Sequence, residues 1–202
     1  LKNGTYKHGG YTTFYVTEPK LRRIEKSRYI DRIVHRFVVD NFLKEYFEKS
    51  FIYHTYACIK NRGMHKACLN VQKAMRHCKI IWNDYYILKM DIRKYFDNIN
   101  KDILLKILKR KVLDKKLLWL LQEIIYSNCT KEELENQKAI RKGLPIGNYT
   151  SQIFANIYLN ELDQYIKNEL KIKYYFRYLD DSVVFVKTKE EAKEILKEIK
   201  VF

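Results

Sequence analysis

Three aspartates lie at positions where a carboxylate gains little from its surroundings. Asp91 follows the mostly apolar run YYILKM, and Asp180 and Asp181 lie between KYYFRYL and SVVFV, two runs with a strong strand preference. Burying an unpaired carboxylate is costly, and adjacent carboxylates repel each other. Two aspartates at a hairpin tip are most often only a turn. However, three carboxylates at strand ends also suit a divalent cation such as Mg²⁺, which prefers oxygen ligands.

The elements that must position these carboxylates follow from hydrophobic periodicity. Residues 85–92 alternate as in a strand that ends at Asp91, residues 174–187 predict two short strands, and residues 11–17 predict another. Asn100 is a predicted helix cap, and Thr188 with Glu191 predicts a capping box. This order of elements indicates an α+β protein in which helices cover one face of an antiparallel sheet. Helices are expected at 29–48, 64–79, 100–111, 115–127, 150–169 and 189–199, and a loop or hairpin at 128–142.

The charge of the chain is positive and unevenly distributed. The net charge is +16. Residues 1–80 carry 17 basic and 6 acidic residues (+11), residues 81–142 carry 14 and 9 (+5), and residues 143–202 carry 9 and 9 (zero). An A/T-rich genome explains abundant lysine, but it does not explain this concentration toward the N-terminus. The distribution favours a nucleic-acid partner, because neutralising phosphates requires a basic region.

Three segments resemble motifs of the reverse transcriptases. Residues 177–181 (RYLDD) resemble the Y-x-D-D motif, residues 89–99 resemble motif A, and residues 143–152 followed by a helix resemble motif B. Their order is that of the family, and blocks similar to its fingers extend the resemblance upstream to about residue 18. The resemblance implies a polymerase right-hand fold without a thumb. It places mostly helical fingers at 1–87 and the palm at 88–202, with about 100–146 partly returning to the fingers.

The resemblance also implies an activity and the residues that carry it. The expected enzyme is an RNA-directed DNA polymerase, which extends a DNA or RNA primer with deoxynucleotides on an RNA template. Two Mg²⁺ ions, or Mn²⁺ in their place, are expected on Asp91, Asp180, Asp181 and the main-chain carbonyl of Ile92. Phe96 is expected to exclude a 2′-hydroxyl, although it is equally suited to be a core aromatic. The resemblance assigns Lys20, Arg22, Ile146 and Gly147 to the nucleotide, and Arg62, Lys66, Asn148, Ser151, Gln152 and Tyr178 to the template or primer.

Some of these assignments have competing interpretations. Lys20 and Arg22 are also consistent with solvated surface charges, Arg23 competes for the same role, and Ser151 also suits a plain helix cap. In motif B, Ile146 occupies a position where intron-type and viral enzymes usually have Gln. This departure is similar to the reverse transcriptases of diversity-generating retroelements, which copy adenine with frequent errors. An apolar side chain there cannot make a polar contact, so we hypothesise that base-pair geometry is checked less stringently.

Several alternatives remain open from the sequence. The chain also resembles group II intron-like or defence-associated bacterial reverse transcriptases. The three intact aspartates disfavour a binding or maturase module with little polymerase activity. Phe96 disfavours an RNA polymerase, because its ring is expected to exclude the 2′-hydroxyl of a ribonucleotide. The resemblance suggests a small basic accessory protein as a partner. Four cysteines without a C-x-x-C pair, and the lack of a long apolar run, indicate a cytoplasmic protein that does not enter a membrane. The resemblance implies a bacterial or phage-encoded protein.

Overall fold

The chain divides into two compact units, each built from two separate segments. A computed structural model describes residues 1, 4–18, 20–136 and 138–202. The first unit comprises Leu1–Lys49 and Lys94–Tyr158, and the second comprises Ser50–Arg93 and Leu159–Phe202. The proposed boundary between fingers and palm concerns the grip on a nucleic acid, so it stays a prediction beside this division by packing.

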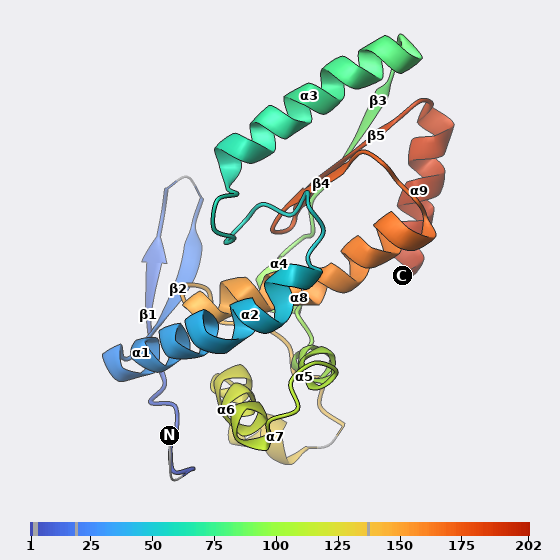
Figure 1. Ribbon diagram of the computed structural model, residues 1–202. Coiled ribbons are helices and arrows are strands. Elements are labelled where there is room, and N and C mark those ends of the chain that lie inside the picture. The colour runs from blue at the N-terminus through green and yellow to red at the C-terminus, as the bar shows by residue number, and fades with distance from the viewer. Residues whose placement is uncertain (2–3, 19, 137) are drawn as a thin grey trace. The chain divides into compact units, whose positions relative to one another are not determined.

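The N-terminal part of the first unit is a hairpin followed by a long helical segment (Figure 1). Strands β1 (Tyr11–Val16) and β2 (Arg22–Ser27) pair antiparallel over their whole length. Helix α1 (Tyr29–Val38) continues through a π-helical turn (Val39–Leu43) into α2 (Lys44–Phe47). The strand and helix predicted for 11–17 and 29–48 are confirmed. Their buried side chains include Val34, Val38, Val39, Leu43 and Phe47.

Of the remaining helices of the first unit, α5, α6 and α7 begin at side-chain caps. Asn100 accepts hydrogen bonds from the main-chain nitrogens of Asp102 and Ile103, which satisfies two free donors at the start of α5. Residues 128–142, predicted as a loop or hairpin, contain the short helix α7, because Thr130 and Glu133 form a reciprocal capping box. The helices are α4 (Tyr95–Asn98), α5 (Lys101–Lys109), α6 (Lys115–Tyr126), α7 (Lys131–Glu135) and α8 (Tyr149–Gln164), which ends in the second unit.

The second unit is a three-stranded antiparallel sheet with helices. The strand order is β3-β5-β4, with β3 at Tyr86–Met90, β4 at Tyr175–Tyr178 and β5 at Asp181–Val186. Its helices are α3 (Met64–Trp82), the end of α8 with a π-helical turn (Tyr165–Glu169), and α9 (Lys189–Val201). Thr188 caps α9 by accepting from the nitrogen of Glu191. The predicted α+β class is thus confirmed.

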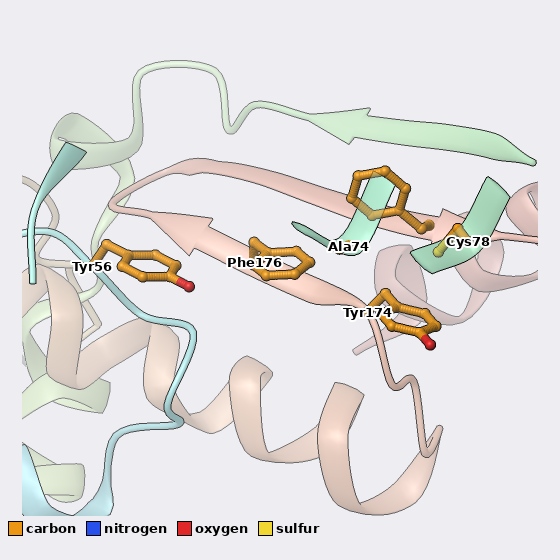
Figure 2. Packing of buried hydrophobic residues seen from close by; sticks show 6 residues of the cluster. Tyr56, Ala74, Cys78, Tyr174 and Phe176 are labelled. Carbon is orange, nitrogen blue, oxygen red and sulfur yellow. The ribbon is translucent and has the colours of Figure 1, made fainter. Parts of the chain in front are cut away.

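Helices cover both faces of this sheet: α8 and α9 lie on one face, and α3, from the segment predicted as fingers, lies on the other. Because strand side chains alternate, Tyr174, Phe176 and Phe185 face α3, whereas Tyr175 and Val184 face the other side. Figure 2 shows the rings of Tyr174 and Phe176 in a row near Ala74 and Cys78 of α3. The opposite cluster includes Ile166, Ile172, Val186, Ala192, Ile195 and Ile199. The additional cover has a sequence basis, since Ala67, Val71, Ala74 and Cys78 form an apolar stripe along α3.

Among the described residues, no helix is long and apolar enough to cross a bilayer. The four cysteines, all among the described residues, form no disulfide bond with one another.

One histidine of the first unit is buried without a complete set of partners. His35 on α1 is 1% exposed. Its Nδ1 lies 3.3 Å from Thr150 Oγ1, while its Nε2 has no hydrogen-bond partner among the described residues. Burial lowers the pKa of His35 to about 4, and the neighbouring His8 acts in the same direction. The imidazole is therefore neutral in the folded protein at neutral pH.

Acid is expected to destabilise the first unit through His35. A histidine in the unfolded chain has a pKa of about 6.5. The stability that the neutral, buried His35 contributes is therefore complete above pH 6.5 and is lost as the pH falls toward about 4. The difference between the two pKa values corresponds to about 3 kcal/mol. Urea unfolding measured between pH 7 and pH 4.5 should show a flatter profile for His35→Gln. His65→Gln, which alters an exposed residue of α3, should keep the wild-type slope. Parallel profiles for His35→Gln and the wild type would contradict this assignment.

Candidate active site

The hairpin between β4 and β5 carries two of the three aspartates. Tyr178 and Asp181 form the last pair of this ladder, so only Leu179 and Asp180 make the turn. Leu179 has a φ of 54°, in the left-handed region that leucine rarely adopts. The predicted strands on either side of these residues are confirmed, and Asp180 lies at the hairpin tip.

The sheet register brings the third aspartate to the same end. Strand β3 runs antiparallel to β5, and their last pair is Met90 with Ser182. Asp91 follows directly, so it leaves the sheet next to Asp181; the strand ends one residue earlier than predicted. Asp91 and Asp181 are exposed, and Asp180 is half-buried. Three carboxylates from two separate parts of the sequence thus gather at one edge of the second unit.

The carboxylates do not form a closed metal cage. Within the described part of the chain, no three His, Cys, Asp or Glu side chains converge closely enough to hold an ion. Mg²⁺ rarely needs such a cage, because it keeps several waters and is often held by one or two carboxylates together with substrate phosphates. The side chains of Asp91 and Asp181 are exposed and have no hydrogen bond or ion pair to any described residue. This donor set fits a magnesium site that substrate would complete.

A cavity of about 220 Å³ adjoins the carboxylates on the α3 side of the sheet. Tyr178, predicted to contact template or primer, lines it together with Asp181, Lys89 and Ser182. Its apolar wall is formed by Tyr56, Ala67, Val71, Phe176 and Val183. Asp181 therefore borders a mostly aromatic and aliphatic hollow that is also lined by two cationic side chains, Lys89 and Arg177.

Two basic residues predicted to touch the template are engaged within the second unit. Arg62 Nη1 donates to the carbonyl oxygens of Ile52 (2.8 Å) and Thr55 (2.9 Å). Lys66 Nζ donates to the carbonyl of Asn61 at 3.3 Å. Both cations also lie near the ring of Tyr53, 5.8 and 5.9 Å from its centroid. In this structure they hold the loop before α3, and contact with a template stays a prediction.

In the first unit, the motif B loop is fastened to β2. The nitrogen of Glu25 donates to the carbonyl of Ile146 (2.8 Å), and Asn148 Nδ2 donates to the carbonyl of Glu25 (3.0 Å). Gly147 lies between them with a φ of 115°, and a Cβ there would lie 2.8 Å from Ile24 Cγ2. Glycine is thus required by the strand behind the loop as well as by backbone conformation. Ile146, half-buried, lies near the strand that carries Arg22.

The same loop is also connected to the segment that carries Phe96. The nitrogen of Leu144 donates to the carbonyl of Phe96 (2.9 Å), and that of Gly143 donates to the carbonyl of Ile99 (3.0 Å). Tyr95 donates to the carbonyl of Ala155 on α8 at 2.7 Å. Phe96 is half-buried and packs edge-on against the Tyr95 ring. Phe96 and the motif B loop therefore belong to one hydrogen-bonded assembly.

The other predicted contacts of the first unit differ in exposure. Lys20 and Arg22 are exposed, whereas the competing Arg23 pairs with Glu25 at 2.8 Å. Of the residues predicted to meet the template, Gln152 is exposed, whereas Asn148 and Ser151 are each 3% exposed. Asn148 and Ser151 support the loop and the first turn of α8 in this structure, and their contact with a template stays a prediction.

Sequence reasoning missed a buried ion pair behind the β4–β5 turn. Arg177 on β4 and Asp163 on α8 are 2% and 0% exposed, and they form two hydrogen bonds with each other. A signal was available: Asp163 interrupts the apolar stripe of a predicted helix, and a buried carboxylate requires a partner. The identity of that partner depends on tertiary packing.

Comparison with known proteins identifies the family. The family model described as "Reverse transcriptase (RNA-dependent DNA polymerase)" matches residues 12–202, and the chain belongs to this family. It is 24% identical over 163 residues to the putative COX1/OXI3 intron 2 protein of Saccharomyces cerevisiae, covering 81% of this chain and 17% of that protein. It is 26% identical over 179 residues to the group II intron-encoded protein LtrA of Lactococcus lactis subsp. cremoris, covering 86% and 28%.

The fold is that of a polymerase right hand. The chain superposes on telomerase from Candida tropicalis, solved with a TWJ fragment of telomeric RNA, with a TM-score of 0.62 at 12% identity. The match covers 95% of this chain and 38% of that one. The chain thus spans well under half the length of each of these three proteins.

Proposed function

We propose that this chain carries the polymerase active site of a reverse transcriptase, which extends a primer 3′-hydroxyl with deoxynucleotides on an RNA template. The main support is the register of the second unit's sheet, which gathers Asp91, Asp180 and Asp181 at one edge in a chain of this family. The motif B loop and Phe96, both in the first unit, are the segments to which the family resemblance assigns nucleotide contacts. The excess of basic residues before position 143 suits the nucleic-acid substrate.

Asp91 and Asp180 are proposed as the principal metal ligands, with Asp181 and the carbonyl of Ile92 completing the set. When bound, two Mg²⁺ ions would activate the attacking hydroxyl and stabilise the departing pyrophosphate. Asp91, Asp180 and Asp181 place their carboxylates at one sheet edge, where their negative charge would repel the triphosphate unless cations neutralised it. Lys20 and Arg22 are proposed to bind the triphosphate, Arg22 with the geometric advantage of a guanidinium.

Primer extension tests this function directly. A DNA primer annealed to a defined RNA template is incubated with the natural full-length protein, Mg²⁺ and deoxynucleotides. The matched reaction contains Asp180→Ala. We expect template-dependent extension that the substitution abolishes. Absence of extension would overturn the proposal in favour of a binding module. Extension unaffected by Asp180→Ala would overturn the assignment of the active site to this sheet edge.

Sugar selection is expected to depend on Phe96. Phe96→Val removes the ring proposed to clash with a 2′-hydroxyl. It should raise the relative kcat/KM for ribonucleotides by about 10- to 200-fold, the range for small steric differences in a pocket. Single-nucleotide insertion with dNTP and NTP measures the ratio. Phe42→Val, at another half-buried phenylalanine of the first unit, should leave it unchanged. An unchanged ratio in Phe96→Val would make this residue a core aromatic only.

Two retroelement classes fit this chain, and Ile146 is the residue that favours one of them. We propose the error-prone, diversity-generating type, because the apolar Ile146 cannot make a polar contact near the nucleotide. The similarity to a group II intron-encoded protein supports an intron-like enzyme instead.

The main-chain bond of Ile146 to Glu25 does not depend on its side chain. Ile146→Gln should therefore fold and lower misreading of template adenine by about 10-fold, as measured by product sequencing. Ile146→Leu is the matched control. Equal adenine errors in Ile146→Gln and wild type would refute the account.

A further inference from the structure

Arg177 uses its guanidinium to connect two parts of the second unit. Its Nε donates to Asp163 Oδ1 (2.8 Å) and its Nη2 to Asp163 Oδ2 (2.6 Å), which is a bidentate pair. Its Nη1 donates to the main-chain carbonyl of Leu179 (2.9 Å). One rigid planar group thus joins helix α8 to the turn formed by Leu179 and Asp180.

Asp163 is held as firmly as its partner. Tyr175 donates to Oδ1 at 2.8 Å and Thr55 Oγ1 donates to Oδ2 at 3.0 Å, so each carboxylate oxygen accepts from Arg177 and from one hydroxyl. Burial, followed by the Asp163 charge, raises the pKa of Tyr175 well above its ordinary value, so the phenol keeps the proton that it donates. A buried ion pair satisfied in this way fixes the guanidinium in one orientation.

The turn holds one residue in a conformation that its residue type disfavours. Leu179 has a φ of 54°, a conformation that is unfavourable in a residue other than glycine. It persists only where surrounding contacts require it. The hydrogen bond from Arg177 to the Leu179 carbonyl is such a contact, and it acts on the peptide unit directly before Asp180.

We propose that Arg177 is a positioning residue for the polymerase site: anchored by Asp163, it fixes the Leu179–Asp180 peptide and thereby the direction of the Asp180 carboxylate. This inference rests on the proposed function, since it assigns Asp180 a ligand role. Arg177 does not itself touch the reacting atoms.

The main chain of β4 does not need the guanidinium to stay in place. The nitrogen of Arg177 donates to the carbonyl of His54 (2.9 Å), and its carbonyl accepts from the nitrogen of Tyr56 (3.1 Å). On its other side β4 pairs with β5 along its length. A change confined to the side chain should therefore alter the turn more than the strand.

Arg177→Lys separates positioning from folding. Lysine keeps the charge that pairs with Asp163, but a single ammonium lacks the planar fork needed to reach both carboxylate oxygens and the Leu179 carbonyl. The matched control is Arg141→Lys in the first unit, where Arg141 likewise pairs with an aspartate (Asp102, 2.9 Å) and donates to a carbonyl (Glu133, 3.0 Å). A second variant, Arg177→Met with Asp163→Asn, removes both charges and leaves an amide for the Thr55 and Tyr175 hydroxyls.

The experiment uses the natural full-length protein and two measurements. Steady-state primer extension gives kcat and the KM for dNTP, and hydrogen exchange with mass spectrometry follows the peptide that contains Leu179–Ser182. We expect Arg177→Lys and the double variant to lower kcat by about 10- to 100-fold, the effect of a small misplacement, with little change in KM. Exchange should rise in the turn peptide and not in β3 or α9. Arg141→Lys should change neither kcat nor that peptide.

The outcomes distinguish the two proposals. If the wild type extends no primer, the proposed function fails, whatever the exchange shows. If the wild type is active and either Arg177 variant is folded with wild-type kcat, the positioning role is refuted. Exchange that rises uniformly across the second unit would make the pair a purely structural one and would also refute it.

Discussion

Replacing Asp91 with asparagine is expected to lower kcat for primer extension by about 10³-fold or more, because a metal site contributes several kcal/mol to the transition state and each 1.36 kcal/mol is a factor of ten. The amide keeps the size of the side chain but removes its charge. Asp91 is exposed and lies outside β3, so folding should be unaffected. The activity loss should be partly reversed by higher Mg²⁺ concentrations, which the variant would need to fill the same site.

The same strand supplies a matched control. Asp84 precedes β3 as Asp91 follows it, and it is also exposed. Among the described residues, its side chain pairs only with Lys79, at 3.1 Å on the surface. Asp84→Asn should keep wild-type kcat and the same Mg²⁺ dependence. We expect Asp180→Asn to match Asp91→Asn and Asp181→Asn to lose less. Comparable kcat values for Asp84→Asn and Asp91→Asn would show that the sheet edge holding Asp91 is not the catalytic one.

Features encoded locally could be predicted from the sequence. The cap at Asn100 and the strands around Asp180 depend on neighbours within a few residues, so their patterns are visible in the chain itself. The short helix α7 was predicted as a loop, although its signal, Thr130 followed by Glu133, is equally local. That error came from giving polarity more weight than capping.

Features that depend on distant segments could not be predicted in the same way. Gly147 was assigned to the nucleotide, but the structure gives a further reason for glycine: β2 passes so close that a Cβ would meet Ile24. The packing of α3 against the sheet also depends on distant segments. An apolar stripe predicts that one face of a helix is buried, but it does not identify the element against which that face packs. The pair of Asp163 and Arg177 joins a helix to a strand, and periodicity alone does not identify such partners.

The largest stability effect is expected from breaking that pair on one side. Asp163→Ala leaves the Arg177 guanidinium buried without its counter-ion, and removing one partner of a buried pair costs about 3–5 kcal/mol. It also deprives the Tyr175 and Thr55 hydroxyls of their acceptor. Thermal unfolding should show a decrease in Tm on the order of 10 °C. Because the effect arises in the folded state, the urea m value should stay close to that of the wild type.

A comparison with Asp102 tests whether burial causes the loss of stability expected for Asp163→Ala. Asp102 also pairs with an arginine and accepts from a tyrosine, Tyr126, but its side chain is 42% exposed, against 0% for Asp163. Water can replace the lost partner at that site, so Asp102→Ala should cost no more than about 1 kcal/mol. Asp163→Asn with Arg177→Met should be more stable than Asp163→Ala, since no unpaired charge remains buried. If Asp163→Ala and Asp102→Ala destabilise the protein equally, the buried pair contributes no more than a surface contact, and the fixed guanidinium on which the positioning role depends would lose its physical basis.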